Sequence, residues 1–463
     1  MYRFILLVLI IVFTPLTASA DTLVSSVPGG SITGKVVWTG SVTVAGPVTV
    51  EKGASLTVKA GTIVKFAAGA GLTVAGQMKA EGIKGALVTF TSAAASPTSG
   101  DWAGIAFSEA DDGSTLKFCQ IEYAASVGIA ACSPSVSSCV IRSGVQGIAV
   151  ARKSTSRLSG NTISDMSDCG ITCQMGATPV ISGNTIRKCV QNGVISSKDS
   201  GPVIKGNTIT GCVAGINLSK DVPPVEDNVI KENTTGIYTT MADNGLVLRG
   251  NHITANASGI LCRQFSSPTI EKNDISGNKE QGIVCYRASS PVISRNRVSR
   301  NGVGIFCEQL CNPRITANDI HDNDKGIYLD LSSYAIIKGN NIYDNKAQVE
   351  LGNMSSDWEY KVNNKPVRGG QAQNISMANR GKAVAQAVED RAQIMGYVDA
   401  TGNWWGDKGV AEMDKKGVDA NIEGFIDYYD VPTRTYEGYS GIYVQDRIKY
   451  EGWKKSKIKD AGY

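Results

Sequence analysis

The sequence predicts an all-β fold: a right-handed, three-sided parallel β-helix, in which coils of about 22 residues stack into a solenoid. Three observations predict it. A phrase close to Asn-x-Ile recurs with this period, a Gly followed by Ile or Val returns eight or nine residues after each Asn, and every repeat holds three short apolar pieces. The recurring Asn residues, which we expect to form a structural ladder, are Asn161, Asn184, Asn207, Asn228, Asn251, Asn273, Asn296, Asn318 and Asn340.

The apolar pieces are too short for helices, and Gly, Asn, Ser or Pro bound each of them, so each predicts a strand of about three to five residues. One piece ends before the Asn, one follows it, and the third is the Gly-Ile piece. Pro recurs five residues before many of the Asn residues, where it can open a strand without removing an internal ladder bond. A leucine-rich repeat has a similar period, but it needs Leu-x-x-Leu-x-Leu and a different phase for the Asn.

The repeated Asn has a physical reason. Stacked coils place identical residues about 4.8 Å apart. An Asn side chain tolerates unusual backbone angles at a turn, and stacked amides can bond to one another. A second ladder is expected five residues further on, at Asn233, Asn256, Asn278, Asn301, Asn323 and Asn345.

The coils resemble the parallel β-helix repeats of the pectate-lyase-like superfamily, which includes carbohydrate-binding and sugar-hydrolysing proteins. The segments 53–66, 87–91 and 100–105 resemble the opening coils of many secreted members. Asn403-Trp404-Trp405-Gly406 resembles a motif that often follows their last coil. The resemblance covers about residues 30–430. It implies the fold far more than the activity, because such solenoids serve as lyases, hydrolases, binding proteins and assembly factors.

Four segments are expected. Residues 1–20 read as a secretory signal peptide that ends in a small-residue cleavage site, 21–103 as opening coils, 104–351 as the repeats, and 352–463 as a mixed capping segment with one helix near 380–395. The apolar run of the signal is too short to span a membrane, and no later stretch is apolar enough. We therefore expect an exported protein in the periplasm, outside the cell or on its surface.

The charge of the chain bears on nucleic-acid binding, and the positions of its cysteines bear on disulfide formation. The net charge is +4 and both signs are interspersed, which gives no support for nucleic-acid binding. Eleven cysteines suggest disulfides in an exported protein. Successive side chains of a strand point to opposite faces, however, and this alternation directs Cys173, Cys262, Cys285 and Cys307 into the core. Side chains stacked in parallel register are spaced too widely for a disulfide. We therefore expect mostly free thiols.

The outward positions of the Gly-Ile strands collect aromatic and charged residues. Such a face suits sugar rings and hydroxyl groups, and a regular rung spacing suits an extended polymer. The alternative is that the C-terminal segment folds back and covers this strip. The predicted substrate-binding residues are Tyr238, Arg263, Tyr286, Phe306 and Tyr328.

Catalytic and metal sites have weaker candidates. The superfamily resemblance implies acidic residues that hold calcium, with an Arg or Lys as base, and glycoside hydrolysis needs a pair of carboxyl groups. The catalytic candidates are Arg297, Arg300, Asp319, Asp322, Glu308 and Asp330, and the calcium candidates are Asp319, Asp322, Asp324 and Asp344. The plainer interpretation of Asp274, Arg297 and Asp319 on consecutive rungs is a surface charge ladder. The two His residues stand three coils apart and cannot form a pair.

These observations favour an exported solenoid that binds a polysaccharide or a cell-surface glycan without catalysis. One alternative is a polysaccharide lyase or glycoside hydrolase. The other is a structural or assembly protein that docks a protein partner through its C-terminal segment. No cofactor is required by the sequence, and calcium is the one that the carboxylates would suit.

Overall fold

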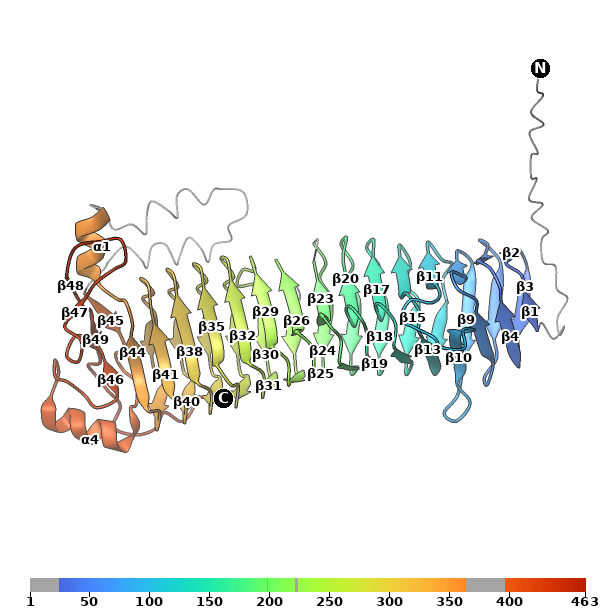
Figure 1. Cartoon of the computed structure of the whole chain (residues 1–463). Coiled ribbons are helices and arrows are strands. Elements are labelled where there is room, and N and C mark those ends of the chain that lie inside the picture. The colour runs from blue at the N-terminus through green and yellow to red at the C-terminus, as the bar shows by residue number, and fades with distance from the viewer. Residues whose placement is uncertain (1–24, 198, 221–223, 364–395) are drawn as a thin grey trace, which may run out of the picture. The chain divides into compact units, whose positions relative to one another are not determined.

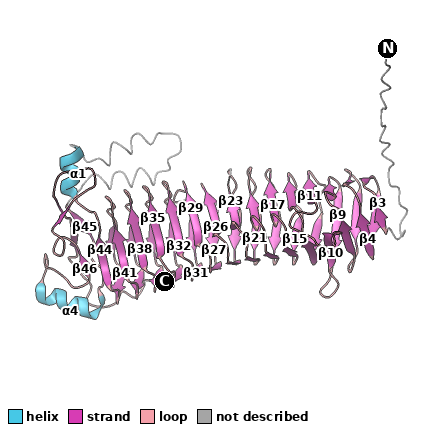
Figure 2. Ribbon diagram, in the orientation of Figure 1, coloured by secondary structure: helices cyan, strands magenta, loops and turns pink. Residues whose placement is uncertain are grey.

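The computed structural model describes residues 25–197, 199–220, 224–363 and 396–463, and the expected signal peptide and the helix near 380–395 lie outside them. The chain divides into two compact units, 1–167 and 168–463, which we describe separately. Strands dominate the described residues of both units (Figure 1, Figure 2). In the repeats, from β1 to β44, the strands form three sets of parallel sheets, and each strand pairs with the strand three positions further along the chain.

We call the sheet of Gly-Ile strands sheet A, the sheet of strands that follow the Asn sheet B, and the sheet of strands that precede it sheet C. In the first unit, sheet A consists of β2 (Gly30–Ile32), β5 (Val48–Val50), β8 (Gly71–Val74), β11 (Gly104–Ser108), β14 (Val127–Ala130) and β17 (Ile148–Ala151). Sheet B consists of β1 (Ser26–Val27), β4 (Ser41–Val44), β7 (Ile63–Phe66), β10 (Val88–Ser92), β13 (Cys119–Glu122), β16 (Val140–Arg142) and β19 (Thr162–Ser164). Sheet C consists of β3 (Lys35–Trp38), β6 (Ser55–Val58), β9 (Gln77–Glu81), β12 (Thr115–Lys117), β15 (Ser135–Ser137) and β18 (Arg157–Ser159).

The second unit continues the same pattern. Its sheet A consists of β20 (Ile171–Cys173), β23 (Asn192–Ser196), β26 (Ala214–Ser219), β29 (Thr235–Thr240), β32 (Ser258–Arg263), β35 (Gln281–Tyr286), β38 (Val303–Glu308), β41 (Lys325–Leu329), β44 (Ala347–Leu351) and β46 (Phe425–Ile426). Its sheet B consists of β22 (Thr185–Arg187), β25 (Thr208–Thr210), β28 (Val229–Lys231), β31 (His252–Thr254), β34 (Asp274–Ser276), β37 (Arg297–Ser299), β40 (Asp319–His321) and β43 (Asn341–Tyr343). Its sheet C consists of β21 (Val180–Ser182), β24 (Val203–Lys205), β27 (Val225–Glu226), β30 (Val247–Arg249), β33 (Thr269–Glu271), β36 (Val292–Ser294), β39 (Arg314–Thr316), β42 (Ile336–Lys338), β45 (Tyr397–Asp399) and β49 (Arg447–Lys449).

The core of each coil comes from the inward side of these strands. Ile237, Ile260 and Ile283 lie in register on β29, β32 and β35, and each is fully buried. Burying a side chain of this size stabilises the fold by about 1.5–3 kcal/mol. The fold class and the strand-per-coil pattern that the repeat predicts are therefore confirmed.

The glycine before each inward Ile is required by close packing. A Cβ atom on Gly259 would clash with the carbonyl oxygen of Gly282 and would lie 3.1 Å from Nδ2 of Asn278. Because the obstacle is backbone of the next coil, a larger residue cannot be accommodated by a side-chain rotation.

The two Asn ladders are present in the second unit. Asn251 donates from its backbone N and from Nδ2 to Oδ1 of Asn273, at 2.9 and 3.0 Å, and Nδ2 also reaches the carbonyl of Val225 at 2.9 Å. The second ladder repeats this geometry, for example from Asn278 to Asn301. The first ladder ends on Asn403 in the capping segment, whose Oδ1 accepts from N and Nδ2 of Asn340 at 2.8 and 2.9 Å.

All eleven cysteines lie within the described residues, and none of them forms a disulfide there, as expected. Cys262, Cys285 and Cys307 lie in register on β32, β35 and β38 and are fully buried. Burial raises the pKa of each of these thiols, so they remain protonated small core residues.

The capping segment adds helix α1 (Ser356–Asn363), helix α4 (Gly406–Lys416) and an antiparallel hairpin of β47 (Thr433–Arg434) and β48 (Tyr443–Val444). Strand β46 pairs with β44, and β45 and β49 extend sheet C. The edges of sheets A and C at this end are therefore covered by strands that come from outside the repeats. No helix among the described residues is both long enough and apolar enough to cross a membrane.

Candidate functional site

The outward face of sheet A in the second unit carries four partly exposed aromatic side chains, Tyr238, Tyr286, Phe306 and Tyr328. Phe306 and Tyr328 lie opposite each other on β38 and β41. Their ring centroids are 5.4 Å apart, with an angle of 15° between the ring planes. Alternation along the strands puts both rings outside because the flanking residues, such as Cys307, point into the core. The result is a stacked aromatic pair that spans two coils.

A second group on this face surrounds Tyr286. Arg263 lies beside it in the register of β32 and β35, and its guanidinium carbon is 5.6 Å from the ring centroid. Arg287 approaches the same ring at 5.3 Å. Two cations on one ring give a positively charged, aromatic patch whose guanidinium groups can donate several hydrogen bonds.

Charged groups cluster around Tyr328. The Lys325 amine lies 2.9 Å from Oε1 of Glu350 and 4.5 Å from the centroid of the Tyr328 ring. The Tyr328 hydroxyl donates to Oδ2 of Asp330 at 3.3 Å. The other oxygen of Asp330 accepts from the backbone N of Asn353 at 2.6 Å. These bonds hold the Asp330 carboxylate beside the hydroxyl group of Tyr328, at one edge of the aromatic pair.

Burial and neighbouring negative charges favour the protonated, neutral forms of Glu308 and Tyr328. Burial, and then the charge of Asp330, raise the pKa of Glu308 above its usual value. Burial, followed by the charges of Asp330 and Glu350, raises the pKa of Tyr328 to about 12. Tyr328 is therefore a neutral phenol at neutral pH, and Glu308 keeps its proton to higher pH than an ordinary glutamate.

The described part of the capping segment borders this strip at its last coil. Arg434 donates from Nη2 to the carbonyl of Leu351 at 3.1 Å and from Nε to Gln445 at 3.1 Å. Trp358 of α1 stacks on Tyr436, with ring centroids 4.4 Å apart. Tyr238, Phe306 and Tyr328 nevertheless keep part of their surface exposed.

The catalytic candidates lie on two different sheets. Glu308 and Asp330 belong to the sheet A strip, whereas Arg297 and Asp319 lie in register on β37 and β40 of sheet B, and Arg300 is exposed in the turn after β37. Asp274, Arg297 and Asp319 are register neighbours on β34, β37 and β40, but Asp319 is buried, so the three do not form a ladder along an open surface.

Asp319 is not open to a ligand. It is buried, with 6% of its surface exposed, and Oδ2 lies 3.2 Å from the Lys457 amine. Lys457 belongs to the final segment of the chain, which packs on sheet B through Ile458, bonded in both directions to the side chain of Asn341. The ring of Tyr463 lies 5.8 Å from the guanidinium carbon of Arg297.

The four calcium candidates are not gathered into one site. Asp319 pairs with Lys457, Asp322 lies 2.7 Å from Nδ1 of His321, and Asp324 lies 2.6 Å from the Lys346 amine. No group of three or more His, Cys, Asp or Glu side chains in the described segments is placed to hold a metal ion. In the described residues these carboxylates do not meet in one cluster: Asp319 lies in β40 and pairs with Lys457, whereas Asp322 and Asp324 lie in the turn after β40 and have partners of their own.

Comparisons with known proteins place this architecture. A family model described as a right handed beta helix region matches residues 103–253 and 235–381, and one described as a pectate-lyase like beta helix domain matches residues 30–125. The chain belongs to the right-handed β-helix family. No curated protein sequence matches this β-helix protein.

Several solved structures are similar to this β-helix protein. The periplasmic alginate epimerase AlgG is 15% identical, with a TM-score of 0.36 over 68% of this chain and 73% of that one. The A-module of the Azotobacter vinelandii mannuronan C-5 epimerase AlgE4 is 15% identical, with a TM-score of 0.33 over 69% and 86%. The alginate lyase from Paenibacillus sp. str. FPU-7 is 13% identical, with a TM-score of 0.20 over 64% and 88%.

Four residues at the sheet A strip of this β-helix protein were not predicted: Arg287, Lys325, Glu350 and Arg434. Lys325 stands one position before a repeat Gly, a column that holds Thr235, Ser258 and Gln281 in earlier coils and so gives little signal. Glu350 lies in a coil in which Gln348 stands in the position of the repeat Gly. Arg434 comes from a part of the chain without repeats, and nothing in the sequence indicates that it meets Leu351.

Proposed function

We propose that this protein is an exported β-helix that binds an extended polysaccharide or a cell-surface glycan along sheet A of its second unit, without breaking it. The observation that carries the proposal is the partly exposed, stacked pair of Phe306 and Tyr328. Partly exposed aromatic side chains that gather on one face of a protein favour a binding surface there. The apolar faces of sugar rings pack well on such rings.

The groups around the pair supply the polar half of glycan recognition. The carboxyl groups of Glu308 and Asp330 accept hydrogen bonds from hydroxyl groups, and the guanidinium groups of Arg263 and Arg287 donate them. These groups lie on consecutive coils, so the same kinds of contact recur at intervals of about 4.8 Å along the sheet. A repeating surface of this kind favours a chain of sugars over a single small ligand.

A second candidate function is polysaccharide cleavage, and Glu308 is the observation that favours it. Glycoside hydrolysis by two carboxyl groups needs one that keeps its proton beside one that is ionised. The raised pKa of Glu308 next to the charge of Asp330 meets the first half of that requirement. Glu308 would then be the acid and Asp330 the ionised partner.

The test is co-sedimentation of residues 21–463 with insoluble uronate and neutral polysaccharides, with and without calcium, while product release is followed. We expect binding without products. Replacing Phe306 or Tyr328 by Ala should weaken binding about tenfold, the loss typical of an aromatic residue at a binding hot spot. Tyr123→Asn, in a partly exposed position of the first unit where φ is 62°, is the matched control and should bind normally.

Two results would redirect the proposal. New reducing ends or unsaturated products that disappear in the Glu308→Gln variant would make the protein an enzyme. Absence of both binding and products would move the function to a protein partner, with the capping segment as the region to test.

A further inference from the structure

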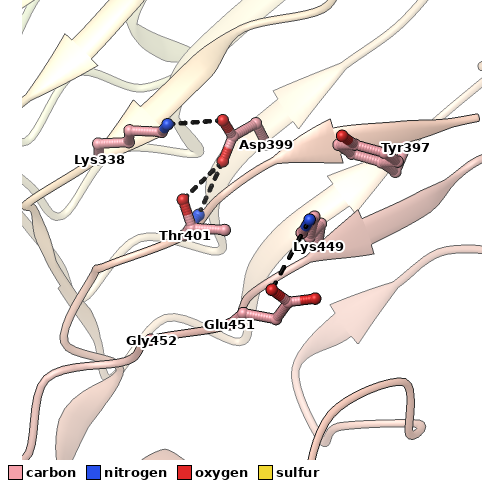
Figure 3. A pocket seen from close by; sticks show the side chains of 7 residues that line it. All are labelled: Lys338, Tyr397, Asp399, Thr401, Lys449, Glu451 and Gly452. Carbon is pink, nitrogen blue, oxygen red and sulfur yellow. Dashed lines mark hydrogen bonds and ion pairs between the residues drawn. The ribbon is translucent and has the colours of Figure 1, made fainter. Parts of the chain in front are cut away.

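A hollow of about 420 Å³ lies on the outward face of sheet C, where β42, β45 and β49 lie side by side (Figure 3). The last two strands come from the capping segment, and their register sets Asp399 beside Ile336 on one side and Lys449 on the other. The side chains that line it are those of Lys338, Tyr397, Asp399, Thr401, Lys449 and Glu451. The hollow therefore belongs to a different sheet from the aromatic strip.

One side of the hollow is fixed by internal bonds. The Lys338 amine lies 2.7 Å from Oδ2 of Asp399, and Oδ1 accepts from the hydroxyl and the backbone N of Thr401 at 2.7 and 3.2 Å. Burial acts to raise the pKa of Asp399, but the bonds from Lys338 and Thr401 outweigh it and lower the pKa below its usual value. Asp399 is thus an ionised, immobile wall of the hollow.

The other side keeps hydrogen-bonding capacity. Figure 3 shows Lys449 and Glu451 facing each other, and their closest charged atoms are 3.7 Å apart, too far for a hydrogen bond. The Lys449 amine also lies 5.1 Å from the centroid of the Tyr397 ring. Its side chain is 36% exposed and that of Glu451 is 51% exposed, so a ligand in the hollow can reach both.

We propose that this hollow binds a neutral sugar unit through two adjacent hydroxyl groups. One hydroxyl oxygen accepts a hydrogen bond from the Lys449 amine, and the neighbouring hydroxyl donates one to the Glu451 carboxylate. A donor and an acceptor set side by side match the spacing of vicinal hydroxyls. Hydrogen bonds to charged groups contribute more binding free energy than bonds between neutral groups. This larger contribution offsets the competition from water at a site that is open to solvent.

Charge and size favour this ligand class over others. The lining carries two amines, Lys338 and Lys449, and two carboxylates, Asp399 and Glu451, so the charges cancel and an ionic ligand gains nothing overall. The volume falls within the range of about 300–1,000 Å³ typical of small-molecule sites. A lining of charged and hydroxyl groups disfavours an apolar ligand and favours a polyhydroxylated one.

The experiment is calorimetric titration of residues 21–463 with the methyl glycosides of glucose, mannose and galactose and with glucuronate. We expect at least one methyl glycoside to bind, with glucuronate no tighter than the matching glucoside. Lys449→Met and Glu451→Gln should each weaken that binding about tenfold, as expected for one lost charge-assisted hydrogen bond. Lys205→Met is the matched control, because Lys205 also lies on sheet C and pairs with a carboxylate, that of Glu226 at 3.2 Å.

The outcomes separate this site from the aromatic strip. The Phe306→Ala variant should bind the glycoside normally if the hollow is the site. The proposal is overturned if no methyl glycoside gives a saturable signal, if glucuronate binds more tightly than the glucoside, or if the Lys449 and Glu451 variants bind as well as the unmodified chain.

Discussion

A ladder asparagine is bonded on both sides at once. Asn273 donates from N and Nδ2 to Oδ1 of Asn296 at 3.0 and 2.9 Å, and Nδ2 also reaches the carbonyls of Leu248 and Glu271. Its own Oδ1 accepts two bonds from Asn251. In a buried site, groups that lose these partners cannot turn to water, so each loss costs more than an exposed hydrogen bond would.

Asn273→Ala should therefore destabilise the protein by about 3 kcal/mol, the order expected when buried donors lose their acceptor. Urea unfolding followed by circular dichroism measures the change. Lys279→Ala, at an exposed position in the same coil, is the control and should shift the midpoint little. Equal midpoints for the two variants would show that the ladder is dispensable.

Glu308 gives stability a pH dependence. Its pKa is raised in the folded protein, by burial and by Asp330, so the folded state holds the proton more tightly than the unfolded chain does. The stability that this group contributes is present below the unfolded pKa of about 4.3 and is lost as pH rises through the folded pKa.

Glu308→Gln has no proton to lose, so its stability relative to the unmodified protein should increase between about pH 4 and pH 7. Thermal unfolding at a series of pH values measures this difference. A difference that stays constant across the range would contradict the raised pKa.

At the scale of elements, the buried carboxylate of Asp446 connects helix α1 to the segment that leads into β49. Oδ1 of Asp446 accepts from the backbone N of Ser356 at 2.8 Å, and Oδ2 accepts from the hydroxyls of Ser356 and Tyr334 at 2.9 and 2.5 Å. Burial raises the pKa of Asp446 even though these bonds oppose the rise. The residue thus connects the first turn of α1, the strand region before β42 and the chain that leads into β49.

Asp446→Ala should loosen α1 by about 2–3 kcal/mol because the Ser356 amide loses its acceptor. Hydrogen exchange of the α1 amides measures local opening, and exchange elsewhere in the repeats should stay unchanged. Lys361→Ala, which removes only the exposed pair of Lys361 with Asp357, is the control and should have a small effect. Faster exchange throughout the repeats would mean that Asp446 supports the whole unit instead.

The repeated elements could be predicted from sequence, while the capping elements could not. Ile260 and Cys262 occupy the same slots as residues in neighbouring coils, so their inward direction followed from the repeat and is confirmed. Strands β45 and β49 have no such column. Their pairing depends on contacts between segments that are distant in sequence, such as Tyr397 with Arg447, which no local pattern encodes.

The same limit applies to the sites. The outward direction of Phe306 and Tyr328 followed from alternation, and their stacking followed from the parallel register. The burial of Asp319 could not be foreseen, because it depends on Lys457, which is 138 residues away in the sequence. The hollow on sheet C could not be predicted either, because it depends on the pairing of β42, β45 and β49, which come from distant parts of the sequence.

At the scale of the whole molecule, the capping segment protects the end of the repeats. Without it, β44 and β42 would present unpaired backbone groups, and Asn340 would lose Asn403 as its acceptor. Exposed parallel edges of this kind invite pairing with another copy of the chain.

A chain that ends after Leu351 should therefore form oligomers or aggregates, whereas the full-length chain should not do so through this end. Size-exclusion chromatography with light scattering measures the difference. A truncated chain that stays monomeric and folded would show that the last coil needs no cover.

The way in which the first ladder ends has a consequence for how such proteins vary over time. Each Asn offers its oxygen to the coil before it and its amide to the coil after it, and Asn403 closes the series with the same oxygen. A gene duplication that copies one whole coil would add an Asn that finds hydrogen-bond partners in the coils before and after it. A duplication of part of a coil would place the added residues out of register with the ladder. The number of coils in such a protein can therefore change during evolution by whole coils, while Asn403 continues to end the ladder.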